Sequence, residues 1–89
     1  MRLKSNIIIK TYNDKSCYLI DLESEEENFY KCENVTSILI NYINDKNNFD
    51  EADLIKMLKS EFRDVKSDQI ENDVTEFINY MKNQNFVAE

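Results

Sequence analysis

The most distinctive group of reactive side chains in this sequence of 89 residues, two thiols and a cluster of carboxylates, lies between positions 17 and 32. Two cysteines, Cys17 and Cys32, stand on either side of a cluster of glutamates. The cluster consists of Glu23, Glu25, Glu26 and Glu27. A pair of thiols can form a disulfide, bind a metal ion or supply a nucleophile, and clustered carboxylates attract cations.

Metal binding and nucleophilic catalysis need further residues that this sequence does not supply. The sequence has no histidine, so the two thiols cannot complete a tetrahedral zinc site without help from carboxylates. No activating base is evident beside either cysteine, and the absence of glycine excludes a glycine-rich phosphate loop. We therefore expect a protein that is not an enzyme, with no catalytic residue, metal or cofactor. Because cytosolic thiols stay reduced, we expect both cysteines to be free.

Charge narrows the range of partners. The 18 acidic residues outnumber the 11 basic ones, which gives a formal net charge of −7. Such a protein repels nucleic acids and anionic membranes at long range and favours a neutral or basic partner. No apolar run approaches the roughly 18 residues of a membrane span, and the N-terminus has no signal-peptide pattern. We expect a cytoplasmic protein with one domain over residues 1–89.

The first part of the chain predicts three strands. Residues 6–12 are β-branched, residues 17–22 alternate, and residues 29–32 form a third short run of strand-favouring side chains. Glycine and proline are absent, so asparagine, aspartate and serine must make the turns. These runs predict a three-stranded antiparallel meander with the third strand at an edge.

The alternation also predicts a register. Pairing Ile20 with Tyr30 leaves residues 23–27 as the loop and puts every core-facing candidate on one face of the hairpin. Those candidates are Tyr18, Ile20, Leu22, Tyr30 and Cys32. In this register Cys17 points away from Cys32, which argues against a disulfide.

The remainder of the chain predicts three helices. The first carries an amphipathic stripe within residues 35–43. Asp50 is a good N-cap for the second helix, which ends before residues 63–66. Ser67 is the predicted N-cap of the third. The predicted stripe of the third helix is Ile70, Val74, Phe77, Ile78 and Met81, and we expect Phe86 and Val87 to return to the core after it. The expected fold is α+β, in the order βββααα, similar to a winged helix-turn-helix.

Three segments carry a resemblance to a known family. YLIDLES at 18–24, FYKCENVTSIL at 29–39 and FINYMKNQNFV at 77–87 resemble the PqqD family, named for a pyrroloquinoline quinone biosynthesis protein. Members of that family bind the leader segment of a ribosomally made precursor peptide. The leader adds as an extra strand to the third strand, beside the third helix, and a partner enzyme, often a radical S-adenosylmethionine maturase, modifies the peptide. The resemblance implies this role here.

By position, the resemblance places a peptide groove between residues 28–32 and the helix at 69–81. The implied peptide-binding residues are Asn28, Phe29, Tyr30, Lys31, Cys32, Asp73, Phe77 and Tyr80. Phe77 also fits a plain core position, whereas Tyr80 has the apolar face and polar tip of a contact residue. The glutamates at residues 25–27 have two interpretations. Their negative charge either discourages the strand edges of two copies from pairing and attracts a basic leader, or they simply form a solvated turn.

Two other functions use the same predicted fold. A winged helix suggests DNA binding. However, the third helix has four acidic residues and only one basic residue, Lys82, so it cannot neutralise DNA phosphates. Those acids are Asp68, Glu71, Asp73 and Glu76. A general protein-interaction module, including a homodimer formed edge to edge, stays open as an alternative.

Overall fold

The computed structural model describes residues 1–13, 16–23, 29–46 and 48–88. The strands are β1 (Arg2–Leu3), β2 (Ile7–Asn13), β3 (Ser16–Asp21), β4 (Phe29–Glu33) and β5 (Val87–Ala88). The helices are α1 (Val35–Asn44), α2 (Glu51–Glu61) and α3 (Ser67–Asn83). Asn28 and the glutamates at 25–27, which were singled out above, lie outside the described residues.

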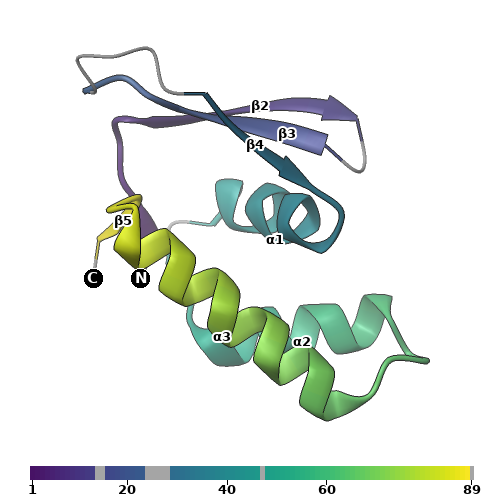
Figure 1. The fold of residues 1–89 in the computed structure, drawn as a ribbon. Coiled ribbons are helices and arrows are strands. Elements are labelled where there is room, and N and C mark those ends of the chain that lie inside the picture. Colours follow the sequence, from purple (N-terminus) through teal and green to yellow (C-terminus); the bar gives the residue numbers. More distant parts are fainter. Residues whose placement is uncertain (14–15, 24–28, 47, 89) are drawn as a thin grey trace.

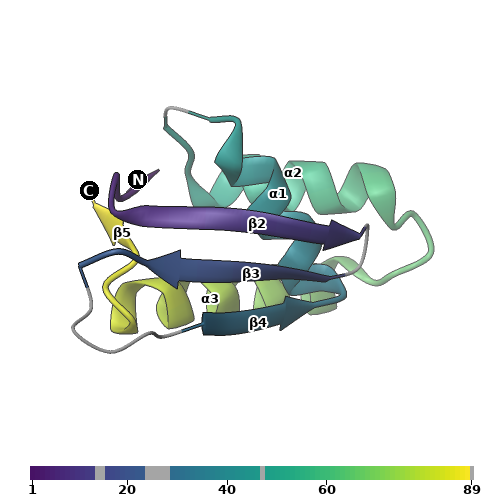
Figure 2. The same ribbon diagram turned by 90° about the horizontal axis from the view of Figure 1, so that it is seen from above.

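The main sheet is an antiparallel meander in the order β2-β3-β4, and all three helices lie on one side of it (Figure 1). Seen from above, β4 forms one edge of the sheet, and α3 runs along the same side of the molecule (Figure 2). This confirms the α+β fold with three strands followed by three helices. It also confirms that the third strand of the meander is an edge strand.

The predicted register of the hairpin is wrong by one residue. The structure pairs Leu19 with Tyr30 and Cys17 with Cys32. Because a shift of one residue turns every side chain to the other face, Cys17 and Leu19 are fully buried, whereas Leu22 is 61% exposed. Tyr18 and Ile20, which were expected in the core, are half-buried on the outer face of the sheet. On β4 the prediction is right, since Cys32 is buried and Tyr30 half-buried.

Asp21 explains why the sequence pattern misled. It belongs to the same face as Cys17 and Leu19, and a carboxylate makes that face look like the solvent side. Asp21 is the last residue of β3, where its Oδ1 accepts hydrogen bonds from the side chain of Asn6 at 2.8 Å and the backbone N–H of Glu23 at 3.0 Å. Because these hydrogen bonds satisfy the carboxylate, placing it on the inner face at the end of the sheet costs little free energy.

The stripe predicted on α3 is confirmed, whereas on α1 the buried residues Ser37 and Ile40, beside Leu39 and Ile43, were not part of the predicted stripe. On α3 the buried residues are Ile70, Val74, Phe77, Ile78 and Met81. The start of α2 is also as expected, because the Asp50 side chain accepts from the N–H of Asp53 in a reciprocal capping box. Ser67, however, is not an N-cap. The N–H of Ile70 bonds to the carbonyl of Lys66, so α3 begins at Ser67 and Lys66 takes the cap position without a side-chain hydrogen bond.

This difference between the two helix starts predicts a difference in stability. Asp50→Ala removes the capping box and should lower the free energy of unfolding by about 1 kcal/mol. Ser67→Ala removes a hydroxyl that caps nothing and should change it by less than about 0.5 kcal/mol. Urea unfolding followed by circular dichroism measures both. Equal losses would contradict the assignment of the two caps.

A second, two-stranded sheet joins the ends of the described chain and was not predicted. β1 pairs with β5, and the N–H of Lys4 bonds to the carbonyl of Phe86 at 2.9 Å. As expected from the sequence, Phe86 and Val87 return to the core after α3. Strands of two residues carry no periodicity, so the sequence has no signal for them. Within the described residues, no helix has the length and apolar character that crossing a bilayer requires.

Candidate functional site

The outer edge of β4 carries backbone groups that no strand of the described chain pairs with. The N–H of Leu22 bonds to the carbonyl of Asn6, the residue directly opposite it across the β2–β3 ladder. Hydrogen-bonded pairs alternate along antiparallel strands, so every second residue of β3, counted from Leu22, directs its backbone groups toward β2. The residues between them, which include Leu19 and Cys17, direct theirs toward β4. Leu19 and Cys17 are paired with Tyr30 and Cys32, whose backbone groups therefore point toward β3. The backbone groups of Phe29, Lys31 and Glu33 therefore point away from the sheet, as an added strand requires.

Two adjoining hollows lie between this edge and the helices. The first, here called the edge hollow, is lined by Lys31, Cys32, Glu33, Thr36 and Tyr80. The second, the helix hollow, has a volume of about 400 Å³. It is lined by Glu33, Asn34, Val35, Thr36, Leu39, Asp73, Glu76, Phe77 and Tyr80. Because both hollows include Glu33, Thr36 and Tyr80, they adjoin each other, and the two together are here called the β4–α3 groove.

A sharp connection between β4 and α1 shapes the groove. Asn34 alone separates the two elements, and it adopts φ 57° and ψ −128°. Positive φ costs an asparagine less than most residues, although this backbone conformation still stores strain. The immediate turn brings the start of α1 beside the strand edge, so Val35 and Thr36 contribute to the wall of the groove.

Aromatic packing fixes the other wall. The ring of Phe86 makes edge-to-face contacts with Tyr30, at 4.9 Å between centroids, and with Tyr80, at 6.2 Å. Tyr80 is 37% exposed, so it presents part of its ring to the groove while Phe86 supports it from below. Partial burial raises the pKa of the Tyr80 phenol above its usual value. Tyr80 therefore stays a neutral hydrogen-bonding group at physiological pH.

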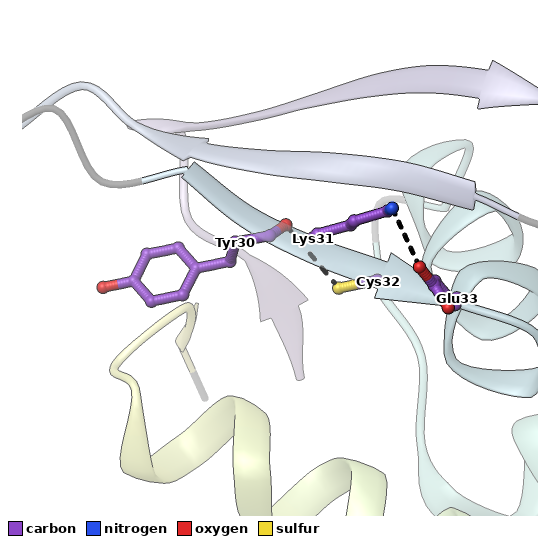
Figure 3. Close-up of polar contacts among 4 residues, drawn as sticks. All are labelled: Tyr30, Lys31, Cys32 and Glu33. Atoms are coloured by element: carbon purple, nitrogen blue, oxygen red, sulfur yellow. Dashed lines mark hydrogen bonds and ion pairs between the residues drawn. The ribbon is translucent and has the colours of Figure 1, made fainter.

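Polar contacts along β4 are shown in Figure 3. Lys31 Nζ lies 3.0 Å from the Glu33 carboxylate, on the same face of the strand (Figure 3). The hydrogen bond and the charge of Glu33 raise the pKa of Lys31 above its usual value. Charged side chains are common on exposed edge strands, where they limit aggregation.

The two cysteines are neighbours rather than pointing apart. They lie directly opposite each other on β3 and β4, both buried and both free. Burial, and then the nearby Cys17 thiol, raise the pKa of Cys32 to about 12. A thiol with this pKa remains protonated near neutral pH, so Cys32 is a poor nucleophile there. In the part of the chain that the structure describes, no group of acidic or cysteine side chains is arranged to hold a metal ion.

The structure gathers most of the predicted site residues around the groove. Lys31, Cys32 and Tyr80 line the edge hollow, and Asp73 and Phe77 join Tyr80 in the helix hollow. Tyr30 instead packs on Phe86, and Phe29 is placed only by its position on β4. Asn28 lies outside the described residues.

Sequence reasoning missed the contribution of α1. The residues of α1 concerned are Val35, Thr36 and Leu39, and the other lining residues that were not predicted are Glu33 on β4, Asn34 before α1 and Glu76 on α3. The sequence does contain an indication of this contribution, because almost no residues separate the third predicted strand from the first predicted helix. So short a connection forces the helix to start at the strand edge.

A family model described as coenzyme PQQ synthesis protein D (PqqD) matches residues 17–87. The chain belongs to the PqqD family. The matched region of this PqqD-family protein includes all of β3 except Ser16, together with β4, all three helices and the residues of the β4–α3 groove. No curated protein sequence matches it.

Among solved structures, one that matches is described as "TbiB1 in Complex with the TbiA(beta) Leader Peptide". The TM-score is 0.80, the sequences are 14% identical, and the alignment covers 100% of both chains. At this identity the likeness establishes a shared fold. The two chains therefore share a backbone arrangement along their entire aligned length.

Proposed function

We propose that this PqqD-family protein binds the leader segment of a ribosomally made precursor peptide by strand addition to β4. The observation that supports this most is the β4–α3 groove, which runs beside an edge strand with outward-pointing backbone groups. An extended peptide satisfies such groups, so the main chain supplies affinity, and side-chain pockets supply specificity. The structural neighbour TbiB1, which has the same fold, was solved with a leader peptide.

The groove suits binding better than catalysis. Its described lining has one thiol, Cys32, whose raised pKa keeps it protonated, and it has no histidine, because the chain contains none. The protein therefore acts without chemistry of its own: it holds the leader and presents the rest of the precursor to a separate modifying enzyme, such as a radical S-adenosylmethionine maturase. The binding residues that we propose are those lining the groove, with Lys31, Asp73, Phe77 and Tyr80 among them.

An open edge also allows a second copy of the chain to pair with it. Such a homodimer and the peptide complex would compete for the same backbone groups of β4. We therefore expect that any dimer formed at high protein concentration dissociates when the leader is added. Light scattering during a titration measures this competition directly.

The function can be tested before the leader is identified. Fluorescein-labelled synthetic peptides are tiled across every short open reading frame beside the gene, and their binding to the full chain is measured by fluorescence anisotropy. We expect peptides from the N-terminal part of one frame to bind, and those from its C-terminal part to bind at least about tenfold more weakly. If no peptide binds, or if only C-terminal peptides do, leader recognition is not the function.

A further inference from the structure

We infer that the bound peptide places a lysine or arginine side chain in the helix hollow, between α1 and α3. This inference rests on the proposed function and adds the chemical class of one ligand residue. Three features of the hollow support it: an apolar floor, a rim of carboxylates, and direct continuity with the open edge of β4.

The floor of the helix hollow suits a hydrocarbon chain. Leu39 on α1 and Phe77 on α3 are 1% and 5% exposed and line the hollow, and the half-buried Val35 adds to its apolar wall. A side chain of the bound peptide that reaches past the edge hollow would lie against these groups. Burial of its apolar atoms there is favourable.

The rim carries negative charge. Asp73 and Glu76 are three residues apart on α3, so they are neighbours on the helix surface, and both line the hollow. Glu33, at the end of β4, also lines the hollow, but its carboxylate is engaged by Lys31. Across residues 1–13, 16–23, 29–46 and 48–88, no lysine or arginine forms an ion pair with Asp73 or Glu76.

One feature of the hollow favours an anion instead. The first turn of α1 lies in its wall, contains no acidic residue, and has no side-chain cap from Asn34. A helix N-terminus acts as about half a positive charge. Two full carboxylates, at Asp73 and Glu76, outweigh it. The net charge of −7 adds a long-range attraction for cations.

Lysine and arginine match both the floor and the rim. Each has an apolar stem that can lie on Leu39 and Phe77 and a charged head that reaches outward. A purely apolar side chain would fill the floor but leave the carboxylates partly desolvated without a partner, which is unfavourable. An aspartate or glutamate would meet like charge. The occupant that the hollow fits best is therefore a basic residue of the peptide.

A displayed library of random linear peptides, selected for binding to the immobilised full chain, tests this inference. Three proteins are compared: the wild type, the double variant Asp73→Lys/Glu76→Lys, and the control Glu61→Lys/Asp64→Lys. The control makes the same change in net charge at exposed residues away from the groove. Circular dichroism verifies the fold. Asp73→Asn/Glu76→Gln replaces the first variant if that one does not fold.

We expect wild type and control to enrich peptides with lysine or arginine at one fixed position. The Asp73→Lys/Glu76→Lys variant should enrich peptides with aspartate or glutamate at that position. A peptide selected on the wild type should bind this variant about tenfold more weakly than it binds the wild type. With the neutral replacement, the basic preference should disappear. Enriched peptides without a basic position, or the same shift in the control, would overturn the inference and leave the proposed function intact. If no peptide is enriched on the wild type, the proposed function itself fails.

Discussion

Lys31→Pro should weaken leader binding by at least about tenfold relative to Lys31→Ala. The backbone N–H of Lys31 points away from β3, so its loss removes a donor to the added strand and leaves the β3–β4 ladder intact. The proline ring also occupies space that a neighbouring strand needs. Anisotropy titrations with the leader peptide identified by tiling measure the effect.

The alanine variant is the proper reference because both substitutions remove the Lys31–Glu33 ion pair. Thr11→Pro supplies a second control on the opposite edge of the sheet. By the same alternation, the N–H of Thr11 on β2 also points outward, but away from the groove. Its substitution should leave affinity unchanged. Equal affinities of folded Lys31→Pro and Lys31→Ala would show that the leader does not pair with β4.

The proposed binding by strand addition requires an edge that is open when the leader arrives. Exposed edges promote aggregation unless charge or shape blunts them. Here the charged pair Lys31 and Glu33 lies on the same strand whose outward backbone groups are open. Each copy has one positive and one negative charge here, so an antiparallel pair of edges can place Lys31 opposite Glu33, and these charges do not by themselves prevent self-pairing. The leader therefore has to compete with a second copy for this edge.

The sequence predicts the helices well because long periodic stripes average out single ambiguous residues. All five residues of the expected stripe from Ile70 to Met81 are buried. The N-cap at Asp50 is also right, because its capping chemistry is local. Ser67 has the same kind of side chain but lies one residue too late, since the hydrogen bond to the carbonyl of Lys66 sets the start of α3. Caps are therefore predictable in type but not to the residue.

The site is harder to predict than the fold, because it depends on how distant elements meet. The edge position of β4 and the nearby face of α3 follow from element order. The contribution of α1 depends on Asn34, whose positive φ turns the chain at once into the helix. Likewise, the support of Tyr80 by Phe86 requires the return of the chain after α3. Neither feature has a periodic signature in the sequence.

The register error on β3 leads to the largest expected change in stability. Leu19→Ala should lower the free energy of unfolding by about 3 kcal/mol, because Leu19 is fully buried between the sheet and the helices and its truncation leaves a cavity. Leu22→Ala should change it by less than about 0.5 kcal/mol, since that side chain is 61% exposed. The register predicted from the alternation alone reverses this order, with Leu22 in the core and Leu19 outside.

Urea unfolding of both variants therefore decides which face of β3 meets the helices, and the answer bears on the groove. Since Leu19 is paired with Tyr30, the registers of β3 and β4 are linked. A larger loss for Leu22→Ala than for Leu19→Ala would favour the register predicted from the alternation, in which Ile20 is paired with Tyr30 and β4 is shifted by one residue along β3. The edge that the leader is proposed to join would then lie at a different position relative to α3. The stability of one buried leucine thus tests the geometry on which peptide recognition depends.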